Sequence, residues 1–187
     1  MLQNVIAGLQ GIIDHAMVGH YVGYTGNAAI GVSWQIILVV IVFISSLFTG
    51  MAVLVARFAG ADDAEKVNNV VDQSFLTSAG LAVLLAAVGY VAAPMLLVLV
   101  NASPEVQAEA LPFMRTMFLG GVGQIMFFML SGAFRAAGDP RTPLKLGILL
   151  TVLTVVFNVV LIPKLGTIGA AYGTIASSVV VSLYGIW

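Results

Sequence analysis

One acidic side chain stands alone in a long apolar stretch near the start of this sequence. Asp14 is the only charged residue before Arg57. A carboxylate at membrane depth costs about 2.5–3.5 kcal/mol on insertion scales, so such groups usually face a protein interior or a wet cavity. Because desolvation favours the neutral acid, a group of this kind can take up and release a proton near physiological pH. Asp14 is therefore a candidate proton carrier, the alternative being an acid close enough to its helix end to reach headgroup water.

A second set of polar residues could support such an acid. Gln10 lies one helical turn before Asp14, so both project from the same side of a helix. Thr151, Thr154 and Asn158 follow one another at i, i+3 and i+7, which makes one polar stripe. An asparagine in hydrocarbon without a partner is costly, so we expect Asn158 to form a hydrogen bond across a helix interface. For the threonines, a bond to their own helix backbone is the simpler explanation.

The composition indicates the solvent around these residues. The chain has 187 residues, of which 60% are hydrophobic and 8% charged, and its mean hydropathy is +1.09. Ordinary soluble domains carry about 25% charged residues. The net charge of −1 and the lack of a basic stripe give no attraction to nucleic acid, and the absence of cysteine excludes disulfides and thiolate metal sites. The sequence therefore predicts a membrane protein whose first partner is the lipid bilayer.

Other residues that often do chemistry form no recognisable site. His15 and His20 are five residues apart, which places them on different helix faces, so we expect no metal site there. Motifs of zinc hydrolases, serine hydrolases, phosphate loops and dinucleotide-binding folds are absent, which argues against an enzyme. Three glycines fall within Gly120–Gly123, where they favour either close helix packing or a broken helix that acts as a hinge.

Stretches without charge predict the membrane-spanning elements. A bilayer-crossing helix needs about 20 mostly apolar residues. The sequence contains about six such segments, and the second to fourth are long enough to tilt or to extend beyond the hydrocarbon. Their approximate bounds are 1–20, 29–57, 69–100, 106–134, 143–163 and 167–187.

The basic residues predict the orientation. Lys and Arg gather in and beside the connections 58–68 and 135–145, whereas Lys164 is the one such residue in the connections on the other side. Short cytoplasmic loops carry the excess of basic residues, so we expect these two loops in the cytoplasm and the protein in the cytoplasmic (inner) membrane.

Local signals also predict where helices begin and end. We expect Asp62 or Asp63 to cap the third helix and Ser103 to cap the fourth. The segment Gly138–Pro143 is predicted to be a tight turn, because its two prolines remove helix donors and Gly138 can adopt a left-handed backbone.

The order of several motifs resembles one transporter family. The first helix ends in IIDHAMVGHYVG, and the second runs out through GMAVLVARFAGADDAEKV. The segment LSGAFRAAGDPRTPLKL covers the end of the fourth helix and the loop after it, and FNVVLIPKLGTIGAAYGT joins the fifth helix to the sixth. Together these resemble the amino-terminal lobe of the multidrug and toxic compound extrusion (MATE) transporters.

The resemblance implies a fold and a set of site residues. Members have twelve helices in two six-helix lobes and exchange drug for H⁺ or Na⁺ by alternating access, with no cofactor beyond the coupling ion. Asp14 matches the proton- or cation-binding acid of the first helix, and Thr154 and Asn158 match a polar pair on the fifth. Many members carry Asn or Asp at both positions of that pair, so Thr154 is a departure. Thr174 matches a threonine on the sixth helix, and Gln10 is assigned to the substrate-lining surface by its spacing.

The same resemblance implies that residues 1–187 form a single transmembrane lobe, truncated at both ends and lacking the second lobe of the same polypeptide. The expected function is cation-coupled export of drugs or other small organic compounds, cationic ones among them, across the cytoplasmic membrane. Two alternatives stay open. One is a lipid-linked oligosaccharide flippase of the same superfamily, for which Arg115 is the one candidate cavity cation. The other is a structural membrane protein in which Asp14 and Asn158 merely hold helices together.

Overall fold

The protein is a bundle of long helices. The computed structural model describes the backbone of residues 2–186, and the side chains of 2–10 and of 14 lie outside the description. Within this range the chain forms helices only, which confirms the predicted all-α class. The helices are α1 (Leu2–Tyr21), α2 (Tyr24–Gly60), α3 (Ala64–Leu99), α4 (Pro104–Gly120), α5 (Val122–Ala136), α6 (Arg141–Leu165) and α7 (Thr167–Ile186).

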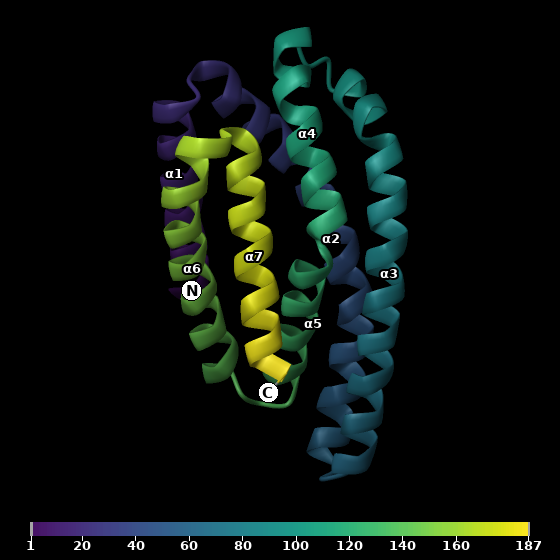
Figure 1. Ribbon diagram of the computed structural model, residues 1–187. Helices are drawn as coiled ribbons and strands as arrows, with labels where there is room; N and C mark the ends of the chain where they lie inside the picture. Colours follow the sequence, from purple (N-terminus) through teal and green to yellow (C-terminus); the bar gives the residue numbers. More distant parts are fainter. Residues whose placement is uncertain (1, 187) are drawn as a thin grey trace.

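The helices run roughly alongside one another, and their connections lie at two opposite ends (Figure 1). The turns α1–α2, α3–α4 and α6–α7 lie at one end, and the turns α2–α3 and α5–α6 lie at the other. The two connections predicted to be cytoplasmic are therefore on the same side of the bundle. The α2–α3 hairpin extends beyond its neighbours at that end (Figure 1).

The helices are longer than predicted at several ends. The second and third helices begin at Tyr24 and Ala64 rather than at 29 and 69, and the connections predicted as 58–68 and 135–145 shrink to 61–63 and 137–140. Charged residues were assigned to loops because they do not enter hydrocarbon. A helix can nevertheless continue into water, where Glu and Lys are good helix formers.

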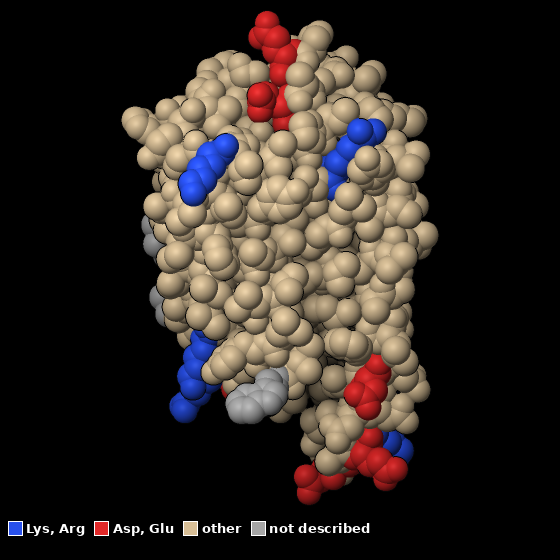
Figure 2. Space-filling model, in the orientation of Figure 1, with Lys and Arg blue, Asp and Glu red and all other residues tan. Residues whose placement is uncertain are grey.

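Four helices are long and apolar enough to cross a bilayer, namely α2, α3, α6 and α7. The bent pair α4 and α5 makes a fifth if it is counted as one span. α1 does not meet the same criterion of length and composition within the described residues, although it was predicted as a span. Its sequence contains Gln, Asn, Asp and His residues, which lower its hydropathy. Charged side chains gather at the two ends of the face shown in Figure 2, with a wide uncharged band between them.

The predicted helix 106–134 is broken at Gly121, and α4 meets α5 at 53°. The neighbouring glycines also allow close packing on α7. A Cβ atom at Gly123 would lie 2.8 Å from the backbone nitrogen of Val179. The Ser182 hydroxyl donates a hydrogen bond of 2.7 Å to the Gly123 carbonyl. The glycine cluster therefore both breaks the helix and permits close packing, and its action as a hinge stays a prediction.

Glycines also bring α6 and α7 together. Gly169 and Gly173 are four residues apart and both are buried on α7. A Cβ atom at Gly169 would lie 2.4 Å from the carbonyl oxygen of Leu161 on α6. Small residues at this spacing let two helix backbones approach closely in a membrane.

Side chains cap two of the helices where the sequence predicted caps. Asp63 accepts hydrogen bonds from the Lys66 backbone (3.1 Å) and from the Lys66 ammonium (2.6 Å). These contacts, the side-chain bond foremost, lower the pKa of Asp63 below its ordinary value. Ser103 caps α4, with Pro104 as the first helical residue.

The α5–α6 turn has the left-handed glycine that its sequence predicted, but it ends at Pro140, and Pro143 lies in the first turn of α6. Gly138 adopts a φ of 91°, in the left-handed region. Asp139 accepts hydrogen bonds from the backbone nitrogens of Arg141 (2.9 Å) and Thr142 (3.2 Å), at the start of α6. The Thr142 hydroxyl also donates to this carboxylate, and that bond is the largest of the contacts that lower the pKa of Asp139.

Candidate polar site between the first, sixth and seventh helices

The polar stripe of α6 points into the protein. Thr154 and Asn158 are both completely buried, and Thr151 is half-buried. The Thr154 hydroxyl donates to the carbonyl of Leu150 at 2.8 Å, and that of Thr151 donates to Gly147 at 3.1 Å. Both threonines thus form hydrogen bonds with the backbone of their own helix, which was the simpler of the two explanations of their presence. A hydroxyl oxygen that donates its hydrogen still has lone pairs with which it can accept one.

Asn158 lies directly against α7. A Cβ atom built on Gly173 would be 1.9 Å from the Asn158 Oδ1 atom and 3.4 Å from the Asn158 backbone nitrogen. The amide oxygen therefore occupies the space that any side chain at position 173 would need. This places Asn158 at an interface between two helices, and the hydrogen bond predicted across that interface stays a prediction.

Thr174 follows Gly173 on α7 and is half-buried. Its hydroxyl donates to the carbonyl of Ala170 at 3.0 Å. The side chain is thus bonded within its own helix, and its role in an ion site stays a prediction.

The proposed acid, Asp14, belongs to α1, which packs against α6 and α7. The α1 backbone contacts α6 and α2, and it contacts α7 less extensively. The side chains of Asp14 and Gln10 lie outside the described residues. The helices that carry the acid and the amide are thus neighbours, and the direction in which Asp14 points stays a prediction.

The structure contains a polar contact between α1 and α2 that the sequence did not predict. The Nδ1 atom of His15 forms a hydrogen bond with Oδ1 of Asn27. Small residues make room for it, because Gly19 faces the Asn27 amide and Gly31 lies near the His15 ring. Asn27 had been assigned to a connecting loop, and the two residues are 12 positions apart.

A second such contact joins α4 to the start of α7. The hydroxyl of Thr167, a buried residue, donates to Oε2 of Glu109 at 2.9 Å. The Thr167 methyl group also packs beside Gly26 of α2. A carboxylate at a helix amino terminus is favourably placed with respect to the helix dipole. This contact holds together three elements at the end of the bundle where the α6–α7 turn lies.

Arg115 faces α3. Its guanidinium carbon lies 4.6 Å from the centre of the Tyr90 ring, in a cation–π contact. Tyr90 itself is 39% exposed. The cation considered for a flippase cavity is thus engaged between α3 and α4.

The comparisons with known proteins identify the family. The family model described as MatE matches residues 1–160. The chain belongs to the MatE family. This confirms the resemblance to MATE transporters that the sequence motifs indicated.

Relatives of the MatE chain are similar along its full length. A probable multidrug resistance protein, YpnP of Bacillus subtilis, is 28% identical over an alignment that covers 100% of this chain and 42% of the relative. The chain thus spans about two fifths of the length of the curated relative.

Solved structures agree with the fold. A transporter of the MOP superfamily from Pyrococcus furiosus, described as having a binding pocket of reverse polarity, superposes with a TM-score of 0.91 at 26% identity. An outward-facing multidrug resistance MATE transporter gives the same TM-score and identity. The alignment covers 99% of this chain and 41% of either structure.

The described part of the candidate polar site offers oxygen atoms rather than a cluster of metal-binding side chains. Among the described residues, no group of three or more His, Cys, Asp or Glu side chains could hold a metal ion. The Asn158 amide carries a carbonyl oxygen and the two α6 threonines carry hydroxyl oxygens. Such neutral oxygens can accept from a protonated acid or contact a hard cation such as Na⁺.

Proposed function

We propose that the protein exports drugs or other small organic compounds, cationic ones among them, across the cytoplasmic membrane in exchange for H⁺ or Na⁺. The observation that carries this proposal is membership of the MatE family over residues 1–160, together with a relative named as a multidrug resistance protein. A shared fold alone would not support a function. Here the fold comes with a buried polar pair in an apolar helix.

The ion site proposed for this exchange consists of Asp14, Thr154, Asn158 and Thr174, with Gln10 lining the substrate path. Burial of Asn158 supports it, because a buried amide can satisfy either protonation state of a neighbouring carboxyl group. The amide donates to the carboxylate and accepts from the acid. Exchange of one proton or sodium ion at such a site needs no cofactor beyond the ion.

The flippase alternative gains no support from the contacts. Its one candidate cavity cation, Arg115, lies over the Tyr90 ring of α3. The structural-protein alternative predicts that Asp14 and Asn158 matter for stability and for nothing else.

Dye export from vesicles distinguishes these possibilities. The protein is expressed from its complete reading frame, and efflux is followed with a proton gradient, with a sodium gradient and with neither. We expect efflux that depends on one of the two gradients. Equal dye retention under all three conditions would support the structural alternative, and movement of lipid-linked oligosaccharide would support the flippase.

A further inference from the structure

The broken helix creates a hollow that the polar site does not use. A pocket of about 50 Å³ lies between α2, α3, α4 and α5, and none of its lining residues belongs to α1, α6 or α7. It lies on both sides of the break: Met117 and Phe118 come from the last turns of α4, and Gln124 and Phe128 come from α5. The pocket therefore lies beside the break, and Gly121 itself is one of its lining residues.

The lining of this pocket is apolar except for one amide. Its other side chains are aliphatic, aromatic or thioether groups, such as Ile41 and Ile44 of α2 and Leu85 of α3. None of the lining residues is charged, so a charged group would enter at a high desolvation cost. The pocket thus selects against ions.

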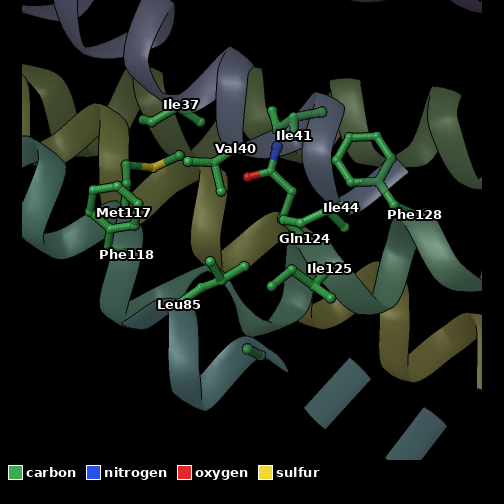
Figure 3. Close-up of a pocket in the computed structure, with 12 residues that line it drawn as sticks. Ile37, Val40, Ile41, Ile44, Leu85, Met117, Phe118, Gln124, Ile125 and Phe128 are labelled. Atoms are coloured by element: carbon green, nitrogen blue, oxygen red, sulfur yellow. The ribbon is translucent and has the colours of Figure 1, made fainter. Parts of the chain in front are cut away.

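Gln124 supplies the one polar contact. Figure 3 shows its amide directed from α5 towards Val40 and Ile41 of α2. Within the described part of the chain no hydrogen bond to this amide is formed. Gln124 is half-buried, and its amide gains a hydrogen bond when a polar group enters the pocket. It can both donate and accept, so an alcohol, an amide or a carbonyl group could satisfy it.

The volume of the pocket limits the size of the group that it can hold. A single water needs about 10–15 Å³, so the space corresponds to about four water-sized groups. Water needs two to four polar partners, and Gln124 is the one polar side chain in the lining. A short alkyl or branched group fits the apolar walls better, and the flexible Met117 side chain can adapt to its shape.

We propose that this pocket binds the apolar end of a small uncharged amphiphile whose single polar group forms a hydrogen bond with Gln124. The proposal rests on the proposed transport function and deepens it, because it adds neutral amphiphiles to the compounds that the protein handles. The site is separate from the polar pair of α6.

Photolabelling tests binding without transport. The chain is illuminated in detergent micelles with a butanol that carries a diazirine group, and the labelled residues are mapped by mass spectrometry. We expect saturable labelling within 37–44 and 117–128, which excess butan-1-ol suppresses and butylammonium does not. Replacing Gln124→Met keeps the length of the side chain and removes its hydrogen bonds. This variant should lower saturable labelling about five- to tenfold.

The matched control is Gln35→Met, because Gln35 is an exposed glutamine of α2 outside the pocket. This variant should label like the unmodified chain. A second variant, Ala82→Leu, fills the pocket from α3 and should also abolish saturable labelling; circular dichroism shows whether each variant is folded. The proposal is overturned if labelling is unsaturable, or if a folded Gln124→Met or Ala82→Leu protein labels normally. Since no gradient is applied, failed transport leaves this result unaffected.

Discussion

Gly173 lies where an added side chain would meet the Asn158 amide. A Cβ atom there would lie 1.9 Å from Oδ1 of Asn158, roughly 1 Å inside the closest approach of about 3.0 Å that real Cβ atoms show. Gly173→Ala therefore requires α6 and α7 to separate, or the Asn158 amide to leave its position. Overpacking of this kind costs about 1–3 kcal/mol.

The matched control is Gly80→Ala on α3, where no atom lies within 4 Å of an added Cβ. In that open position alanine should gain up to about 1 kcal/mol of helix propensity. Both changes replace a helical glycine by alanine, so the gain in helix propensity is common to them, and the two variants should differ by roughly 1–3 kcal/mol in the free energy of unfolding. For a chain of this size that corresponds to a difference in Tm of roughly 2–12 °C. Thermal unfolding in detergent, followed by circular dichroism, measures it.

A double variant separates a clash with the amide from a general effect of crowding. Gly173→Ala combined with Asn158→Ala should recover part of the lost stability, because the oxygen that occupies the space is gone. The reasoning is refuted if Gly173→Ala unfolds at the same temperature as Gly80→Ala. It is also refuted if the double variant is no more stable than the sum of the single effects predicts.

Three further outcomes follow from individual contacts. Ser182→Ala removes the donor to the Gly123 carbonyl and should lower the free energy of unfolding by about 1 kcal/mol in chemical denaturation. Thr167→Val keeps the shape but leaves Glu109 without this donor, so it should cost about 1–3 kcal/mol, and an unchanged Tm would contradict the contact. The pKa of Asp139 is lowered in the folded protein, so its contribution is present above the ordinary carboxyl pKa of about 3.9 and is lost as pH falls through the folded value. When the pH is lowered below about 4, the Tm of the Asp139→Asn protein should therefore fall less than the Tm of the unmodified chain.

Features that depend on neighbouring residues could be predicted from the sequence. The caps at Asp63 and Ser103 and the left-handed Gly138 follow from local chemistry, and all three occur. The placement of Asn158 at a helix interface could also be predicted, because a lone amide in hydrocarbon needs such a position.

Features that depend on tertiary packing could not be predicted in the same way. The His15–Asn27 and Glu109–Thr167 contacts join residues that are 12 and 58 positions apart, and no spacing rule links them. The sequence suggested two roles for the glycines around Gly121 without deciding between them, because the same residue type permits both. The structure shows a helix break at Gly121 together with close packing of α7 on Gly123.

The orientation of α1 is the remaining step between the fold and the proposed ion site, and an engineered crosslink examines it. The chain has no cysteine, so two cysteines introduced at positions 14 and 158 have no competing thiol in it. We expect this pair to form a disulfide under mild oxidation, whereas a pair at 12 and 158 should not, because Ile12 is 67% exposed.

The central claim is that Asp14 carries the coupling ion, and the most direct measurement is gradient-dependent dye efflux by the Asp14→Asn protein. The variant is expressed from the complete reading frame and compared with Glu65→Gln, which neutralises an exposed acid of α3. The account predicts that Asp14→Asn remains folded and inserted but that its efflux no longer responds to the gradient, while Glu65→Gln behaves like the unmodified protein. Full gradient dependence in a folded Asp14→Asn protein would contradict the claim and would assign the acid a structural role.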